Sequence, residues 1–304
     1  RQLPIGVPKL LVSTMASGDT SAYVDTSDIT MMYSVVDIAG INKLSAEILS
    51  NAAAAVAGMA TGHESYSADG DERPLVGATM YGTTTPCVDV ARNWLEGEGY
   101  GVLVFHATGP GGRSMEALIA SGHIVASLDI TTTELMDEVA GGTTTAGPDR
   151  LEMAGAMGLP QVISVGASDQ ITFRPPSAVP DHLKNRRSYR HNPAVTLVRS
   201  NAAEMADYGK MLCSKLNRAV GPVTVFVPMR SVSEYDQRGA VFHDAEANEA
   251  LFDVLRSGLE PTVELVEMDN DINDPEFALA MARRLDEHFK DWTESSNRGG
   301  GESK

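Results

Sequence analysis

Short apolar runs alternate with longer stretches of helical period between Pro74 and Phe289, and this alternation constrains the fold more than any other feature of the sequence. Apolar runs of strand length that are separated by helices predict an α/β fold. Because strand–helix–strand connections are right-handed, such units build a mostly parallel sheet with helices on both faces. We expect one sheet of seven strands, at Leu75–Tyr81, Val102–Phe105, Ile124–Leu128, Val162–Val165, Val195–Val198, Val223–Val227 and Thr262–Val266.

Most of the intervening helices have a recognisable start. They are predicted to begin at Pro86, Ser114, Glu134, Leu151, Ala202, Ala245 and Pro275. Thr85 and Asp274 each place a capping oxygen before a proline at the first helical position. The spacings Thr131-x-x-Glu134 and Asn201-x-x-Glu204 resemble capping boxes, in which the two side chains bond to each other's backbone N–H groups.

The first 60 residues read as part of a separate domain. They contain two expected strands, Leu10–Val12 and Ile29–Val36, and an alanine-rich helix, Leu44–Met59. Two strands and one helix are marginal alone, so the other strands of this domain are expected to be absent from the chain or to come from a partner. The expected organisation is an incomplete first domain at 1–62, a polar linker at 63–73, a complete second domain at 74–290 and a disordered tail at 291–304.

The charge of the chain limits its partners. The sequence has 24 Lys and Arg against 41 Asp and Glu, a formal net charge of −17. This balance argues against a nucleic acid polymer or an anionic membrane as the partner, although one bound nucleotide remains compatible with it. Two cysteines in apolar helical stretches, Cys87 and Cys213, form no disulfide framework, and no apolar run approaches the length of a membrane span. A reducing, cytoplasmic location is therefore expected.

The loop from His106 to Glu116 (HATGPGGRSME) is the most specific candidate site. It follows an expected strand and leads into a helix, so it lies at the carboxyl edge of the sheet, where ligands of open parallel sheets bind. Backbone N–H groups at Gly109, Gly111 and Gly112 are predicted to hold phosphate, with Arg113 and Ser114 adding charge and a hydroxyl. The alternative is a tight strand–helix turn that needs the glycines only for its geometry. The loop matches neither the P-loop nor the dinucleotide-binding fingerprint.

Further polar residues are expected at the same edge or in the first domain. The hydroxyls of Thr131 and Thr132 and the guanidinium of Arg230 follow other strands, and Ser17 and Gly18 follow the strand at Leu10–Val12; all are predicted to contact a nucleotide. His191, in a stretch rich in arginine, is predicted either to bind an anion or to offset nearby acids.

Three acidic residues and one histidine are the candidates for chemistry. Asp129 and Asp169 each follow a strand and are predicted either to hold Mg²⁺ through the phosphates of a nucleotide or to cap the next helix. For an enzyme, His106 is the candidate acid or base, with Glu116 or Asp169 as its partner.

Several longer runs resemble one known family. They are Gly6–Asp19 (GVPKLLVSTMASGD), Thr26–Gly40, His106–Glu116, Gly147–Glu152, Tyr189–Pro193 and Val227–Ser233. They are similar to the ATP-binding domain family of the tomato mosaic virus resistance protein, whose bacterial and fungal members form an uncharacterised protein family. The resemblance implies two Rossmann-like domains with ATP at their cleft and a TIM-barrel partner. Members of the family usually begin with a further region of about a hundred residues, roughly one domain.

The sequence therefore predicts an α/β protein with two Rossmann-like domains and mostly parallel sheets, the first domain being incomplete. The predicted function is binding of ATP, with or without Mg²⁺, at the cleft between the domains, and no reaction is assigned. One alternative is an enzyme that acts on a small carboxylate or a phosphorylated metabolite. The other is a non-catalytic regulator of a TIM-barrel protein. The incomplete first domain also makes a homo-oligomer an expectation.

Overall fold

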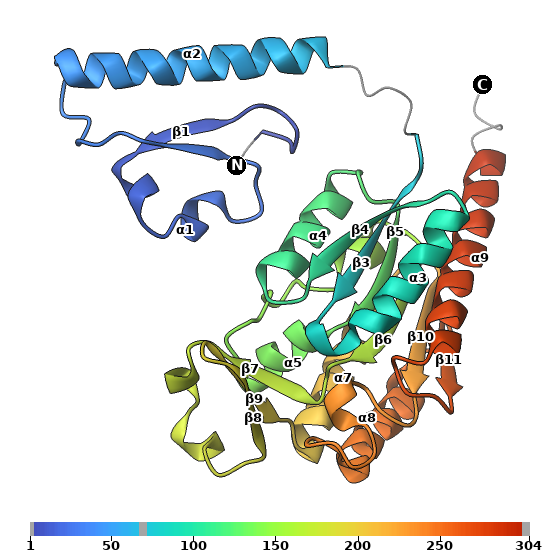
Figure 1. The fold of residues 1–304 in the computed structure, drawn as a ribbon. Helices are drawn as coiled ribbons and strands as arrows, with labels where there is room; N and C mark the ends of the chain where they lie inside the picture. Colours follow the sequence, from blue (N-terminus) through green and yellow to red (C-terminus); the bar gives the residue numbers. More distant parts are fainter. Residues whose placement is uncertain (1–2, 67–71, 300–304) are drawn as a thin grey trace. The chain divides into compact units, whose positions relative to one another are not determined.

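The computed structural model describes residues 3–66 and 72–299, and the chain divides into two compact units, Arg1–Glu72 and Arg73–Lys304 (Figure 1). Each unit is considered by itself. The fold is α/β, as predicted, and its main element is a parallel sheet in the second unit.

The first unit contains the two strands and the helix that the sequence predicts. Strands β1 (Leu10–Ser13) and β2 (Thr30–Tyr33) pair in parallel, with the short helix α1 (Ser21–Val24) between them. Helix α2 (Lys43–Ser65) begins at a capping box formed by Asn42 and Ser45. Because α2 continues to Ser65, the expected linker is wrong at residues 63–65, whereas residues 67–71 lie outside the described part of the chain.

The first unit encloses little apolar surface. Among its described residues, Ala52 of α2 is the only buried hydrophobic side chain. Larger side chains such as Ile41, Leu44 and Val56 are exposed, at 73%, 47% and 38% of their surface. Burial of apolar surface is the main favourable contribution to folding, so the core of the described protein belongs to the second unit.

Six parallel strands form the sheet of the second unit within the described residues, in the order β11-β10-β6-β5-β3-β4 (Figure 1). Their bounds are β3 Leu75–Met80, β4 Gly101–His106, β5 Ala126–Thr131, β6 Gln161–Gly166, β10 Val223–Pro228 and β11 Val263–Met268. The central strands β5 and β6 are buried along their whole length, as the predicted apolar runs require.

Helices cover both faces of this sheet. The bounds are α3 Thr85–Gly97, α4 Pro110–Ala120, α5 Thr133–Ala140, α6 Met153–Ala156, α7 Ala202–Leu216, α8 Ala245–Gly258 and α9 Pro275–Gly299. Neighbouring residues of β6 point to opposite faces. Val162 joins the core cluster of α3 and α9, and Ile163 joins that of α5, α7 and α8.

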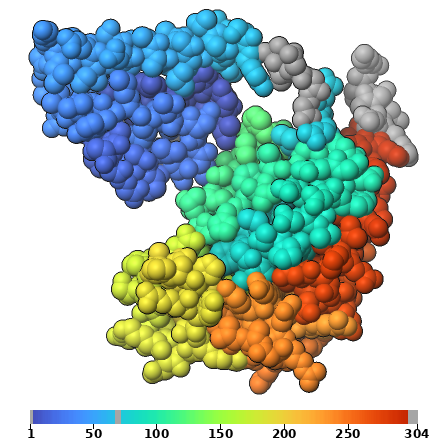
Figure 2. All heavy atoms as spheres, viewed as in Figure 1, coloured from blue at the N-terminus to red at the C-terminus, as the bar shows by residue number. Residues whose placement is uncertain are grey.

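The expected strand at Val195–Val198 does not join the parallel sheet, which corrects the prediction of seven strands. It forms β9 (Val195–Arg199) in a separate antiparallel sheet of order β7-β9-β8, with β7 at Gln170–Phe173 and β8 at Ser188–Asn192. A parallel strand needs a long crossover, usually an α-helix, whereas the fully described segment between β6 and β9 contains strands β7 and β8 and two 3-10 turns but no α-helix. In Figure 2 this segment is the yellow projection on the surface of the second unit.

Two helix ends also differ from the predictions. Helix α4 begins at Pro110 and not at Ser114, because the chain turns at Gly109, whose φ is +95°. Helix α9 continues to Gly299, so the expected disordered tail is wrong at residues 291–299, and residues 300–304 lie outside the described part of the chain. Beyond the predicted end of this helix, the side chain of Trp292 packs against the cluster that contains Met115 and Ile119.

Candidate functional site

The helix start that was predicted to bind phosphate holds a carboxylate of the chain itself. Glu134, which is fully buried in the first turn of α5, accepts hydrogen bonds through Oε1 from the N–H groups of Gly109 at 2.6 Å and Gly112 at 3.1 Å. Free N–H groups at a helix N-terminus favour an anion. The anion is Glu134, and this use of its carboxylate makes the expected capping box between Thr131 and Glu134 wrong.

Close packing explains the glycines of this loop. A Cβ atom added to Gly111 would lie 2.0 Å from the carbonyl oxygen of His106. One added to Gly112 would lie 2.1 Å from Oε2 of Glu134, and one added to Gly109 would lie 2.7 Å from the carbonyl oxygen of Thr145. Gly109 also has φ +95°, which favours glycine. These contacts are those of the tight strand–helix turn that the sequence left open as the alternative.

Arg150 joins Glu134 to two other acidic candidates in one buried network. Its guanidinium donates to Glu134 Oε2 at 2.8 Å, to Asp129 Oδ2 at 2.8 Å and to Glu116 Oε1 at 3.1 Å, and its side chain is 1% exposed. Asp129 also accepts from the hydroxyl of Thr79 at 2.7 Å. Burial raises the pKa of Glu134, and Arg150 opposes that shift. The carboxylates of Asp129 and Glu116 are therefore engaged inside the protein.

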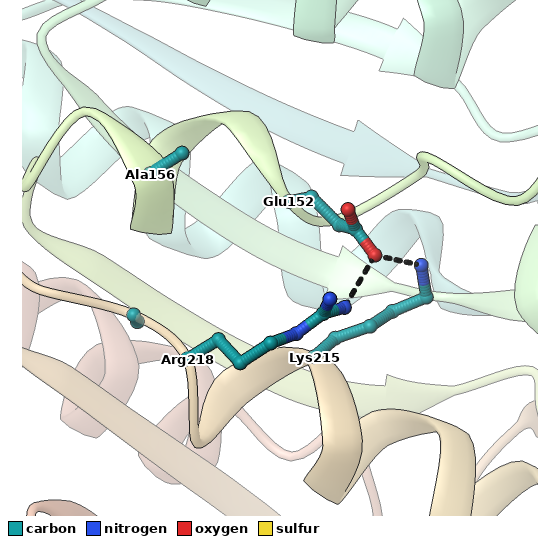
Figure 3. A pocket seen from close by; sticks show the side chains of 5 residues that line it. Glu152, Ala156, Lys215 and Arg218 are labelled. Carbon is teal, nitrogen blue, oxygen red and sulfur yellow. Dashed lines mark hydrogen bonds and ion pairs between the residues drawn. The ribbon is translucent and has the colours of Figure 1, made fainter.

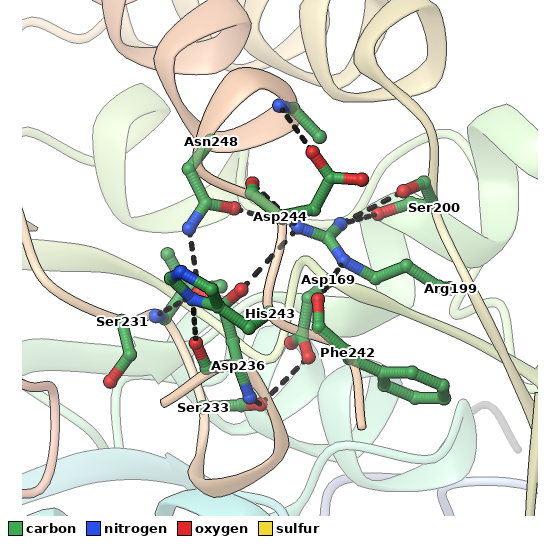
Figure 4. A network of polar contacts seen from close by, with 12 residues as sticks. Asp169, Arg199, Ser200, Ser231, Ser233, Asp236, Phe242, His243, Asp244 and Asn248 are labelled. Carbon is green, nitrogen blue, oxygen red and sulfur yellow. Dashed lines mark hydrogen bonds and ion pairs between the residues drawn. The ribbon is translucent and has the colours of Figure 1, made fainter. Parts of the chain in front are cut away.

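Asp169 lies in a second buried network, between β6 and β7 (Figure 4). Its carboxylate accepts from Ser233 Oγ at 2.7 Å and from Gln170 Nε2 at 3.2 Å. A second buried acid, Asp236, accepts from Asn248 Nδ2 at 2.6 Å and contacts Arg199 Nη2 at 3.5 Å. Burial raises the pKa of Asp169, and burial together with the charge of Asp169 raises the pKa of Asp236 to about 7.

The other predicted contacts are dispersed. The hydroxyl of Thr131 bonds to that of Thr84 at 2.7 Å, and the hydroxyl of Thr132 donates to the carbonyl oxygen of Ser164 at 2.9 Å. Arg230 forms an exposed bidentate pair with Asp269. Arg113 and Ser114 are half-buried in the first turns of α4, and Ser17 and Gly18 end a 3-10 turn in the first unit.

Two predicted residues, His106 and His191, line a pocket at the carboxyl edge of the sheet. The pocket has a volume of about 160 Å³ and is lined by Tyr81, Gly82, Thr83, His106, Arg174, His191, Asn192, Val195 and Leu197. The first four follow or end strands β3 and β4, and the others belong to the antiparallel sheet or follow β7 directly. The imidazole of His106 stacks on the ring of Tyr81, with centroids 5.6 Å apart. Neither Glu116 nor Asp169 lines this pocket.

The lining of this pocket favours an anion. Besides Tyr81, its titratable side chains are the basic residues Arg174, His106 and His191. None of the described residues that line the pocket is acidic, although the chain has a net charge of −17. Burial and the nearby charge of Arg174 lower the pKa of His106, so its imidazole is neutral at pH 7 and can accept a proton. Thr83 and the backbone of Gly82 add neutral polar groups.

Sequence reasoning missed Arg174 because it did not predict strand β7, which brings Arg174 to the pocket. The available signal was the local excess of arginine after position 173. Two other arginines of this stretch offset acids, since Arg186 pairs with Glu204 and Arg187 with Asp244. The interpretation that the stretch offsets nearby acids therefore holds for Arg186 and Arg187, and anion binding by His191 stays a prediction.

A second pocket, of about 140 Å³, is lined by Glu152, Ala156, Lys215, Arg218 and Ala219 (Figure 3). Glu152 Oε1 accepts from both Lys215 Nζ at 2.8 Å and Arg218 Nη2 at 2.7 Å. Helix α6 leads into β6 and α7 into β10, so this pocket lies at the amino end of the sheet. Its paired charges and its position make it the weaker candidate for a ligand site.

Comparison with protein-family models accounts for nearly the whole chain. Residues 73–289 match the model described as "Uncharacterised protein family (UPF0261) C-terminal domain", and residues 1–65 match the N-terminal domain of the same family. The chain belongs to the UPF0261 family. The family level of the resemblance found in the sequence is thereby confirmed, while ATP binding, Mg²⁺, a TIM-barrel partner and self-association remain predictions for this UPF0261 chain.

Relatives of this UPF0261 chain occur in bacteria and in a plant. A UPF0261 protein of Clostridium tetani is 52% identical over 286 residues, which are 94% of this chain and 70% of the relative. One from Mesorhizobium japonicum is 46% identical over 288 residues, or 94% and 72%. The ToMV resistance protein Tm-1(GCR237) of Solanum lycopersicum is 42% identical over 286 residues, which are 92% of this chain but only 38% of the tomato protein.

Two other findings concern the described residues of this UPF0261 chain. None of their helices combines the length and the apolar content that crossing a bilayer requires. They also contain no group of three or more His, Cys, Asp or Glu side chains arranged to hold a metal ion. The second finding fits the internal pairing of Asp129 with Arg150 and of Asp169 with Ser233.

Proposed function

We propose that the second unit binds a small anionic molecule, with a phosphate or carboxylate group, in the pocket lined by His106, Arg174 and His191. The observation that carries this proposal is a lining with three basic side chains and no acidic one, in a strongly acidic chain. A guanidinium beside imidazoles supplies donors that match the oxygens of an oxyanion. The position at the carboxyl ends of parallel strands adds support.

The volume of the pocket indicates how much of a ligand it takes. A space of about 160 Å³ is smaller than the roughly 300–1,000 Å³ of sites that enclose a drug-sized molecule. It suits one phosphate group or a short carboxylic acid. ATP is the nucleotide that we propose as a ligand, with its terminal phosphate in the pocket and its remainder outside. Mg²⁺ would then be held mainly by the phosphates.

A second candidate function, acid–base catalysis on such an anion, rests on His106. Its imidazole lines the pocket and its lowered pKa leaves it neutral at pH 7, which is the state of a general base. Glu116 and Asp169 are not its partners in this proposal, because their carboxylates bond elsewhere. Turnover of a small phosphorylated or carboxylate metabolite, lost in His106→Gln while phosphate is still bound, would support catalysis. Binding without turnover would favour a regulatory role.

The binding proposal is tested by titration calorimetry with inorganic phosphate and with ATP, each with and without Mg²⁺. Arg174→Gln is expected to weaken phosphate binding by about ten- to a hundredfold, because a hydrogen bond to a charged group contributes about 1.5–3 kcal/mol. Arg190→Gln is the matched control, since Arg190 is exposed in the same basic stretch and does not line the pocket. Absence of heat with every ligand, or equal losses in both variants, would overturn the proposal.

The affinity for sulfate is expected to rise as the pH falls from 7.5 to 5.5, by up to about fivefold when His106 is protonated. Sulfate keeps its charge over this range, so the change reports on the protein. The pKa of His106 lies below its usual value, so its imidazole gains its proton at a lower pH than an ordinary histidine does, and a charged donor is worth about 1 kcal/mol more than a neutral one. His106→Gln should remove this part of the dependence. His182→Gln, at an exposed histidine outside the pocket, should keep it.

A further inference from the structure

Gln170 lies directly behind the wall of the anion pocket. It is the first residue of β7, it is fully buried, and its side chain does not line the pocket. Its Nε2 atom donates to the hydroxyl oxygen of Thr83 at 3.0 Å and to Asp169 Oδ1 at 3.2 Å. Thr83 lines the pocket, so Gln170 connects a pocket hydroxyl with a buried carboxylate.

The carboxylate of Asp169 fixes which end of the amide faces Thr83. Oδ1 of Asp169 accepts a hydrogen bond from the nitrogen end of the Gln170 amide, and an acceptor at this place keeps that end turned towards it. The same nitrogen reaches Thr83, and the amide oxygen Oε1 is left buried with no hydrogen-bond partner among the described residues. A buried polar atom without a partner destabilises the fold, and such atoms are few. The amide thus keeps a costly orientation.

The carboxylate of Asp169, which sets this orientation, is itself held by a hydrogen bond on its other oxygen (Figure 4). Ser233 Oγ donates to Asp169 Oδ2 at 2.7 Å. The backbone N–H groups of Tyr235 and Asp236 donate to the same Ser233 Oγ atom, at 3.1 and 3.2 Å, so its own hydrogen is directed to Asp169. The chain of contacts from the interior to the pocket is therefore Ser233, Asp169, Gln170 and Thr83.

These contacts determine what the hydrogen of the Thr83 hydroxyl can do. A hydroxyl has one hydrogen to donate, and the oxygen of Thr83 already accepts from Gln170. Within the described residues the Thr83 hydroxyl donates to no acceptor, although the residue is only 3% exposed and lines the pocket. Its donor is thus available to a ligand in that pocket.

We infer that Gln170 is a positioning residue that, held by Asp169, keeps the Thr83 hydroxyl as a hydrogen-bond donor to an oxyanion in the pocket. This inference rests on the proposed binding function and identifies one of the hydrogen-bond donors to the ligand and the residue that orients it. The group beside Thr83 must present an acceptor oxygen, as phosphate and carboxylate do and an ammonium group does not. It also gives Asp169 a role behind the pocket in place of the predicted roles in catalysis or metal binding.

The test is a double-mutant cycle read by calorimetric titration with inorganic phosphate. Thr83→Val removes the hydroxyl and keeps the shape, and Gln170→Met removes the amide and keeps the length of the side chain. Each single change is expected to weaken phosphate binding about five- to tenfold, as loss of one hydrogen bond does. The double variant is expected to bind no more weakly than Thr83→Val, because both changes remove the same interaction. Thr83→Ser should bind as the wild type does.

The outcomes separate this inference from the function on which it rests. If the wild type binds neither phosphate nor ATP, the proposed function fails. If the wild type binds and Thr83→Val binds equally well, the proposed function stands and the role of Thr83 and Gln170 is overturned. If the losses of phosphate affinity in the two single variants add up in the double variant, Gln170 does not act through Thr83 and has a structural role only. Circular dichroism monitors folding, and Gln170→Asn, whose shorter amide is withdrawn from Thr83, replaces Gln170→Met if that variant unfolds.

Discussion

Replacement of Arg150 by methionine is expected to lower the free energy of unfolding by about 3–5 kcal/mol. The guanidinium of Arg150 is buried and forms ion pairs with Asp129, Glu134 and Glu116. Methionine fills much of the same volume but leaves these carboxylates without their cation in a region of low dielectric constant, which is the costly way to break a buried ion pair. Urea unfolding followed by circular dichroism measures the change.

Arg256→Met is the matched control for this prediction. Arg256 also contacts three carboxylates, those of Glu249, Asp253 and Glu267, but its side chain is 33% exposed on the surface. Exposed ion pairs contribute little, so a loss below about 1 kcal/mol is expected. Equal losses in the two variants would contradict the view that burial, and not the number of partners, decides the importance of Arg150.

The Gly111→Ala variant is expected to lose about 3 kcal/mol of stability, because its Cβ atom would lie 2.0 Å from the backbone carbonyl oxygen of His106. That oxygen cannot move away as the end of a flexible side chain can, so the start of α4 must shift from β4. Gly97→Ala, at the end of α3, is the control: nothing lies within 4 Å of its Cβ position. It should be neutral or stabilising by up to about 1 kcal/mol.

Phosphate titration of these two glycine variants decides between the two interpretations of the loop. If the glycines serve close packing, the stability of Gly111→Ala falls, and any loss of phosphate affinity follows from the displacement of His106. A Gly111→Ala variant with full stability and no phosphate binding would instead support a phosphate site formed by the loop itself. Urea unfolding and calorimetry on the same samples provide both numbers.

The parallel sheet could be predicted because its strands contain short apolar runs and its central strands are buried on both faces. Strands β5 and β6 illustrate this, since their residues are buried from end to end. Strand β8, with the sequence SYRHN, is exposed at every position and carries no apolar run or alternation. It forms by pairing with β9, a tertiary contact that a local pattern does not encode.

The same limit applies to the candidate site. His106 could be found because it ends an apolar strand at the expected edge of the sheet. The occupant of the α4 N-terminus could not, since Glu134 lies 25 residues from Gly109 in the sequence and its pattern suggested a local cap. Arg174 enters the pocket only because β7 pairs with β9. Local patterns thus located the edge of the sheet, and long-range packing decided which side chains line the pocket.

The residues that line the pocket come from two separate sheets. Residues 170–199 form an insert between β6 and α7 that carries Arg174, His191, Asn192, Val195 and Leu197. Part of this insert is integrated into the core, because Ile171, Phe173 and Val198 pack with α5, α7 and α8, whereas β8 is exposed at every position. Substitutions at His191 and Asn192 of β8 can therefore change the charge and shape of the pocket while the parallel sheet keeps its packing.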